Sequence, residues 1–413
     1  MTLKEFKKNP LLQYLISIVI YQCGTIIRLQ LNNQAVGNAL RILSFFILCY
    51  SLYNQLSRGK KNRLSFLMLF LLIWNIINVS ATVFTGDLNL TRTFGEETYI
   101  LNYTLPFLLL YNPKHIPLKE TFKYSIIFEI FALILIILNF QYIAMANNVD
   151  LITGKLGEDT KARSLAQIPI MWSIPAAILF FNYHLVKKKY IIISILAFIL
   201  AIAFSMAFGR RSTSFYGAIF LLAALWFYIS YSHMKLGKKI FIIIISIIIM
   251  VIAVNYIINH FHFLMERGLE DTRSGVNNAF YADMNMIDYI FGRGINGTYY
   301  DPLNIFDKLN NRRTGIETGY LNIILHSGLL FFIPYTLLCL QSAIKGFFYS
   351  RNLLIKSMAI YILINYLLLF FGSYPAYNLR FYILWIGILL CNSIYFRNMN
   401  NNMIKHYFGF NNN

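Results

Sequence analysis

The chain has 413 residues, of which 58% are hydrophobic and only 13% are charged, and its mean hydropathy is +0.56. Soluble domains contain about 45–50% apolar and about 25% charged residues, so this composition excludes a soluble globular protein and predicts a polytopic membrane protein in a lipid bilayer. The formal net charge of +19 could suit nucleic acid, but the basic residues cluster in short connections between apolar segments, so we expect no nucleic-acid partner.

Twelve segments are long and apolar enough to cross a membrane, which needs about 20 residues in a helix. Backbone polar groups in lipid must be satisfied within the segment, so we expect an all-α bundle forming one integral membrane domain over residues 1–413. The predicted spans are 10–28, 35–54, 64–84, 97–111, 122–144, 167–184, 190–208, 212–231, 239–258, 317–344, 353–372 and 378–396.

Every second connection is short and basic, which places these connections and both termini in the cytoplasm by the positive-inside rule. The basic clusters fall at 4–8, 58–63, 114–123, 187–189, 235–239, 345–356 and 397–405. The longest connection, 260–316, then lies on the extracytoplasmic side. It is predicted to contain a short helix near 276–289 that docks on the bundle through Ala279, Met286 and Ile287, before Gly292 and Gly294 break it.

Lysine and arginine are distributed differently in this topology. Seventeen of the 20 lysines lie on the predicted cytoplasmic side, whereas twelve of the 16 arginines lie at or near the opposite face. Phosphate recognition would favour arginine, because a guanidinium is planar, always charged and binds phosphate oxygens in a bidentate manner. Fourteen of the 17 acidic residues also lie on the outer face, so ion pairing is an alternative explanation for part of the excess.

The candidate anion ligands come from several outer connections. Arg210 and Arg211 lie in a tight turn, 209–212, where snorkelling to the interface is the alternative. Arg293 lies between two glycines, which allow close approach of a ligand. Arg380 could also be an interfacial anchor with nearby tyrosines. The arginines expected to bind a phosphate-like anion are Arg210, Arg211, Arg273, Arg293, Arg313 and Arg380.

Glu317 lies where the polar loop meets an apolar helix, which makes it the candidate general base. The alternative is a helix N-terminal acid stabilised by the macrodipole. His326, further along the same segment, is expected to be a packed or hydrogen-bonded core residue. Glu129 is expected to be an intramembrane acid that is either structural or paired with a partner. No group of residues has convincing metal-ligand spacing, so neither a metal nor another cofactor is expected.

These features resemble the O-antigen ligase and polymerase superfamily of bacterial membranes. The resemblance covers most of the chain: the number of spans, the long outer loop between spans 9 and 10, the Arg211–Ser212 turn, and the motifs ArgSerGly at 273–275 and GlyArgGly at 292–294. Tyr320, Leu321 and Gly328 also match. Where the ligases carry a His-Asn pair this chain has Glu317 and Thr318, which favours a repeat-unit polymerase.

The resemblance implies a GT-C-type glycosyltransferase in the bacterial cytoplasmic (inner) membrane. It would join polyprenyl-diphosphate-linked oligosaccharide repeat units into a surface polysaccharide, O-antigen or capsule, without a metal, and could act with a chain-length regulator. The arginines would bind the diphosphate and Glu317 would take the proton from the acceptor hydroxyl. The alternatives are an O-antigen-type ligase and a flippase or transporter for the same lipid-linked sugars. A transporter would place charges along a central cavity.

Overall fold

The structure is a computed structural model that describes residues 3–31, 33–58, 64–84, 98–139, 172–207, 211–232, 234–241, 244, 274–302 and 311–410. Most of the predicted span 239–258 and the first part of 167–184 lie outside these ranges. Helices form almost all of the regular structure, as the composition predicts. The protein is therefore an all-α, multi-pass membrane protein; the full number of spans stays a prediction.

Seven helices in the described part of the chain are long and apolar enough to cross a bilayer. They are α2 (Pro10–Gln30), α3 (Gln34–Arg58), α6 (Leu118–Leu138), α11 (Lys188–Ala207), α12 (Arg211–Tyr231), α17 (Gly319–Phe348) and α18 (Leu353–Leu368). Two further apolar helices are α4 (Phe66–Phe84) and α19 (Leu379–Asn392). Each of these nine helices overlaps a span predicted from the sequence.

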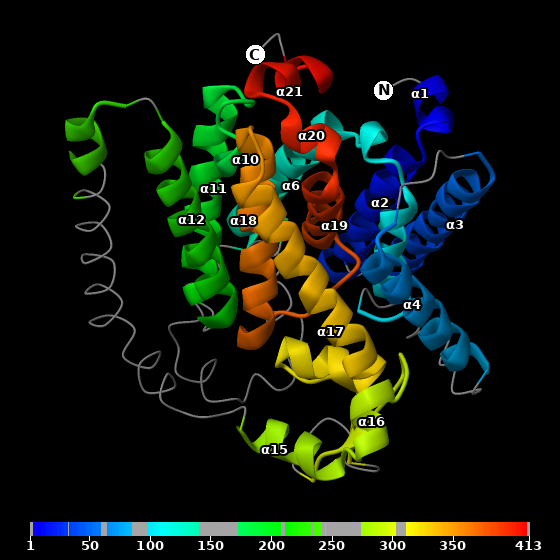
Figure 1. Cartoon of the computed structure of the whole chain (residues 1–413). Coiled ribbons are helices and arrows are strands. Elements are labelled where there is room, and N and C mark those ends of the chain that lie inside the picture. The colour runs from blue at the N-terminus through cyan, green and yellow to red at the C-terminus, as the bar shows by residue number, and fades with distance from the viewer. Residues whose placement is uncertain are drawn as a thin grey trace.

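The helices pack into a bundle whose two ends differ (Figure 1). Both termini lie at one end, here called the terminal end, together with α1 (Leu3–Lys8), α20 (Ile394–Asn398) and α21 (Asn401–Tyr407). At the opposite end, the loop end, lie α15 (Ser274–Asp283) and α16 (Met286–Phe291). This separation agrees with the predicted topology, in which the termini and the long loop lie on opposite sides.

The predicted α-helical span at 97–111 is wrong. The structure instead has a 3-10 helix, η1 (Asn102–Leu110), with Pro106 inside it. Proline cannot donate the backbone hydrogen bond that an α-helix requires, and the segment winds into the tighter 3-10 form. At about 2 Å rise per residue it covers only roughly 18 Å. Its side chains Leu105, Leu108 and Leu109 are fully buried, so η1 is part of the protein core.

The long helix α17 is interrupted at Gly328, whose φ is 68° and ψ is 179°. Gly292, after α16, packs directly on this break: a Cβ on Gly328 would lie 2.2 Å from Ile290 O, and one on Gly292 would lie 2.6 Å from Gly328 N. The interruption frees backbone carbonyls of the preceding turn. Leu325 O accepts the N–H of Arg293 at 2.6 Å, and Ser327 O accepts the indole N–H of Trp74 at 2.8 Å.

The kink divides α17 into two parts. In Figure 1 the part before Gly328, drawn in yellow, runs across the loop end of the bundle, and the rest runs obliquely toward the terminal end. The 20 residues after the kink span about 30 Å, which matches the hydrocarbon thickness of a bilayer. The first part therefore serves as a platform for the loop, whereas the sequence predicted one continuous span.

The described part of the loop forms a small unit on this platform. It contains α15, α16 and a two-residue antiparallel pair, β1 (Tyr299–Tyr300) with β2 (Arg312–Arg313). A predicted helix near 276–289 is present but breaks between α15 and α16. The prediction that Met286 and Ile287 dock on the bundle is wrong, because their side chains are 75% and 68% exposed. Phe280 is fully buried in their place, in a cluster with Tyr299 and Leu325.

The remaining short elements connect or cover these helices: η2 (Pro113–His115), η4 (Ile174–Ala176), α10 (Ala177–Phe181) and η5 (Leu369–Phe371). η5 follows α18 and leads to α19 through residues 372–378. This connection positions the candidate site described below.

Replacing Gly328 with alanine should destabilise the protein strongly, since a Cβ would both clash with Ile290 O and require an unfavourable φ. Gly409→Ala is the matched control, because Gly409 has φ 72° but open space around its Cβ position. The control should cost only about 1–2 kcal/mol. Thermal unfolding of the two purified variants in detergent measures the difference; equal melting temperatures would contradict the proposed glycine contact.

Candidate functional site

Arg293 is fully engaged within the loop unit. Its Nε and Nη2 donate to Asp288 Oδ2 at 3.0 and 2.7 Å, and Nη1 donates to Thr298 O at 2.8 Å. Nη1 also donates to Asp283 Oδ2, and Nη2 to Asp283 O at 2.6 Å. A guanidinium has five N–H donors, and all five are used here. The geometry therefore favours a structural role for Arg293 over the predicted contact with an anionic ligand.

The ion pairs of Arg293 also set the protonation of their partners. Burial raises the pKa of Asp283, but the hydrogen bonds from Arg293 and Tyr300 N and the charge of Arg293 outweigh this and hold the pKa below its ordinary value. Burial lowers the pKa of Arg293, while Asp288 and Asp283 raise it, and the net shift is upward. Both groups are thus charged at neutral pH and link α15, α16 and β1.

Arg313 lies between two carboxylates near the start of α17. Its Nη1 donates to Asp301 Oδ2 at 3.3 Å, and its Nη2 lies 3.9 Å from Glu317 Oε1. The side chain of Asp301 is 2% exposed, whereas that of Glu317 is 57% exposed. The contact with Glu317 is longer than a hydrogen bond. The side chain of the predicted base is therefore largely exposed, and Arg313 lies beside it.

The segment that carries Glu317 is held from two sides. Thr318 Oγ1 donates to Asn277 Oδ1 of α15 at 3.2 Å. On the other side Gly319 touches the connection before α19, because a Cβ on Gly319 would lie 1.7 Å from Ser373 O. Only glycine fits here. The loop unit, the start of α17 and the connection to α19 thus meet at Glu317.

Tyrosines in the loop unit are poor candidates for a base. Burial, and then the hydrogen bond with Tyr320, raise the pKa of Tyr281 to about 12. Burial likewise raises the pKa of Tyr299 to about 12. Both phenols stay protonated at neutral pH. Glu317 remains the exposed carboxylate at this junction.

Arg380, in the first turn of α19, is only 7% exposed. Its Nε donates to Asn365 Oδ1 of α18 at 2.6 Å, while Nη2 is buried without a hydrogen-bond partner in the described part of the chain. Within the same part, no carboxylate pairs with it. An uncompensated buried charge costs several kcal/mol. Among the predicted anion ligands whose side chains the structure describes, Arg380 is thus the one whose environment most favours binding a negative group.

Aromatic side chains surround Arg380. Its guanidinium lies 5.9 Å from the ring centre of Tyr216 and 5.1 Å from that of Phe381. Such cation–π contacts offset only part of the desolvation of a guanidinium. Tyr335 of α17 is buried, and its hydroxyl has no hydrogen-bond partner among the described residues. The alternative prediction of an interfacial anchor does not hold, because Arg380 is buried.

Arg41 of α3 is a second buried guanidinium that the sequence did not single out. It is 6% exposed; Nη2 donates to Tyr21 OH at 3.1 Å, and Nε has no partner within the described ranges. Tyr21 contacts Tyr377 edge to face, three residues before Arg380. Arg41 and Arg380 therefore approach the same connection from different helices. The sequence feature that could have identified Arg41 is an arginine inside an apolar segment with no acidic residue nearby.

The start of α12 reaches the same region. Tyr216 OH donates to Phe371 O of η5 at 2.6 Å, and the ring of Phe215 packs on that of Phe371 at 5.6 Å. Arg211 begins α12, one turn before Phe215. The structure thus brings the start of α12, Arg380 and the Glu317 junction to η5 and the connection that follows it, residues 372–378. Arg210 and Arg273 lie outside the described residues.

His326 is buried, and its Nδ1 makes a hydrogen bond with Gly294 O at 3.1 Å, which confirms the expected core role. Ser327 next to it accepts from Asn78 Nδ2 and donates to Tyr103 OH. Glu129 is fully buried, and its carboxylate has no hydrogen-bond partner in the described residues. No group of three or more potential metal-ligating side chains lies together within the described ranges.

Comparison with known proteins identifies no relative: no family model, curated protein or solved structure matches this chain.

Replacing Arg293 with lysine should destabilise the loop unit by about 2 kcal/mol, since an ammonium cannot reproduce the five hydrogen bonds. Limited proteolysis of the intact protein should then cut within 274–302 faster than in the wild type. Arg312→Lys, at an exposed position on β2, is the control. Equal cleavage rates for the two variants would contradict this role of Arg293.

The stability of the loop unit should also depend on pH. Because the folded-state pKa of Asp283 is depressed, its contribution is present above the unfolded value, near 3.8, and is lost as pH falls through the folded value. Proteolysis by an acid protease should therefore accelerate below about pH 4 in the wild type, and Asp283→Asn should remove most of this pH dependence.

Proposed function

We propose that the protein is a glycosyltransferase that joins polyprenyl-diphosphate-linked oligosaccharide repeat units at the loop end of the bundle. The observation that carries this proposal is Arg380, a buried guanidinium without a carboxylate partner among the described residues, with one nitrogen unpaired. Arg380 lies in the first turn of α19, directly after the connection 372–378, and this connection also contacts the segment that carries Glu317. This arrangement supports a shared site for the two residues. The resemblance to O-antigen polymerases supplies the substrate class.

In the proposed complex the diphosphate binds Arg380, with Arg41 and the first turn of α12 nearby. At about 4 Å one Arg–phosphate pair is worth about 4 kcal/mol at an effective dielectric of about 20, before desolvation. The gain is larger here than for a paired arginine, because no carboxylate has to be displaced. Arg293 has no donor left for the ligand and keeps the loop unit in place.

Transfer requires a base and a stabilised leaving group. Glu317 takes the proton of the acceptor hydroxyl while the hydroxyl oxygen attacks the anomeric carbon. The bond between that carbon and the diphosphate oxygen breaks, and the polyprenyl diphosphate leaves with its charge stabilised by arginine. Arg313 orients Glu317. No metal is needed for charge stabilisation in this scheme.

The loop end is proposed to face the extracytoplasmic side of the bacterial cytoplasmic membrane, with the termini in the cytoplasm. Basic residues support this orientation: Lys7, Lys8 and Lys405 lie in helices at the terminal end. Glu317, in place of the histidine of the ligases, favours a polymerase over a ligase.

Replacing Arg380 with glutamine should reduce polymer synthesis by roughly 100-fold or more, the usual cost of removing a donor that stabilises developing charge. Arg380→Lys should rescue only part of the activity, because the bidentate fork is lost. Arg312→Gln removes the same charge from an exposed position at the same end and should have little effect. The measurement is extension of a purified lipid-diphosphate repeat unit by purified protein; full activity of Arg380→Gln would rule out its proposed role.

Glu317→Gln should abolish extension while leaving the lipid-linked repeat unit bound, since the amide cannot accept the proton. Binding and extension are measured on the same preparation. Wild-type product ladders from this variant would remove Glu317 from the mechanism. If the wild type instead transfers finished polymer to a different acceptor, the ligase alternative holds; if it only moves the lipid across vesicle membranes, the transporter alternative holds.

A further inference from the structure

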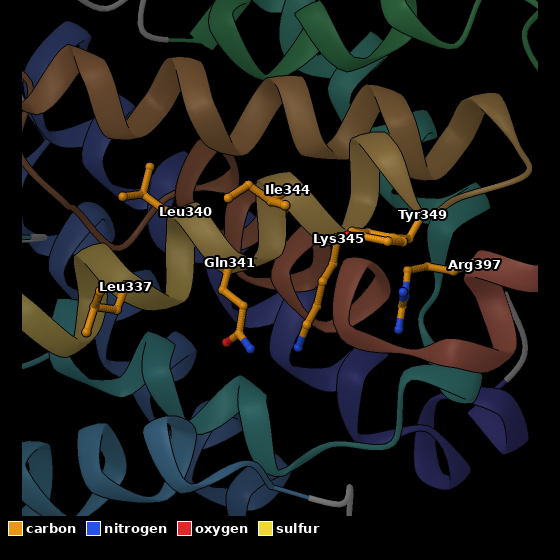
Figure 2. Close-up of a pocket in the computed structure, with 7 residues that line it drawn as sticks. All are labelled: Leu337, Leu340, Gln341, Ile344, Lys345, Tyr349 and Arg397. Atoms are coloured by element: carbon orange, nitrogen blue, oxygen red, sulfur yellow. The ribbon is translucent and has the colours of Figure 1, made fainter.

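A groove of about 580 Å³ lies on the second half of α17 (Figure 2). This half of α17 runs toward the terminal end (Figure 1), away from Glu317, which precedes α17. Leu337, Gln341 and Lys345 follow one another at intervals of four residues, so they lie on one helix face. Figure 2 shows Arg397 of α20 beside Lys345, with the two side chains extending in the same direction. The other lining residues are Leu340, Ile344 and Tyr349.

The groove changes character along its length. Its floor is apolar, and Leu337 and Ile344 are 49% and 52% exposed, as expected for a surface that lipid covers. The part of the groove nearest the terminal end of the bundle carries two cations, Lys345 and Arg397. Eight residues separate Leu337 from Lys345, which corresponds to about 12 Å along the helix. An apolar chain can thus lie on the floor while a charged group reaches the cations.

The two cations have no acidic partner in the described part of the chain. Among the described residues, Lys345 Nζ donates to Asn392 Oδ1 alone, at a long 3.4 Å. Arg397 Nε is buried without a hydrogen-bond partner in the same part of the chain. Two unneutralised cations side by side repel each other, and an anion between them would remove this repulsion. The groove on α17 therefore combines an apolar floor with two cations that an anionic group would neutralise.

We propose that this groove binds one anionic phospholipid. Its phosphate lies between Lys345 and Arg397, Gln341 donates a hydrogen bond to the headgroup, and an acyl chain covers Leu337, Leu340 and Ile344. Basic pockets between membrane helices are suited to such headgroups. The lipid joins α17 to α20 at the terminal end. This site is separate from the proposed glycosyltransferase site at the other end of α17 and does not depend on that function.

The test uses Tyr349→Trp as a reporter in the full-length protein, because Tyr349 lines the groove and is 66% exposed. The protein is placed in nanodiscs of phosphatidylcholine that contain a small fraction of brominated phosphatidylglycerol or brominated phosphatidylcholine. Quenching in the parent protein, which lacks the introduced tryptophan, is subtracted. We expect the effective affinity of the groove for phosphatidylglycerol, measured from quenching of the reporter tryptophan, to exceed that for phosphatidylcholine by roughly tenfold.

Lys345→Gln/Arg397→Gln should abolish this preference, whereas the matched pair Lys119→Gln/Lys187→Gln removes the same charge from exposed positions and should preserve it. Gln341→Glu is a second, nearly isosteric variant, whose added carboxylate should also abolish the preference. Equal quenching by the two lipids in the otherwise unchanged groove would overturn the proposal. An unchanged lipid preference in the variants would also overturn it. Displacement of phosphatidylglycerol by polyprenyl phosphate at equal mole fraction would overturn it too, because the substrate lipid would then be the occupant.

Discussion

The architecture of the loop end depends on the direct backbone contact between Gly292 and Gly328. It interrupts α17 where α16 ends, and the interruption leaves carbonyl groups that the loop and α4 use as acceptors. A side chain at either position would separate the two segments. Because the loop unit is anchored through backbone atoms, its position relative to α17 is defined independently of the polar side chains that could then take up functional roles.

Electrostatic pairing separates the arginines at the loop end into two kinds. Arg293 and Arg313 contact carboxylates and hold parts of the loop together. Arg380 and Arg41 are buried beside tyrosines, and their guanidinium groups each keep an unpaired nitrogen within the described structure. The second arrangement is costly in the absence of an anion. A ligand would recover more free energy at Arg380 than at an arginine that is already neutralised.

Hydropathy predicted the nine long apolar helices that the structure describes, because burial in lipid imposes length and composition directly. Hydropathy could not distinguish the 3-10 helix η1 from an α-helix, because buried apolar residues occur in both. In this segment Pro106 was the sequence feature that indicated the difference. Arg293 looked like a ligand from its glycine neighbours, and its pairing with Asp283 depends on how α15 folds back. Arg380 was predicted from the sequence as an anion ligand and stays a prediction; its neighbours Asn365 and Tyr216 come from helices whose packing order is not encoded locally.

The short length of α19 has a consequence for the depth of the candidate site. Asn392, at the end of α19, contacts Ser342 and Lys345 near the end of α17. From this common level, Arg380 lies about 18 Å along α19, and Gly328 lies about 21–26 Å along α17. Arg380 thus lies roughly 3–8 Å short of the level of the kink. In the proposed complex, a headgroup held by Arg380 would therefore lie slightly deeper in the bundle than the kink, with the prenyl chain toward the bilayer and the sugar toward the loop end.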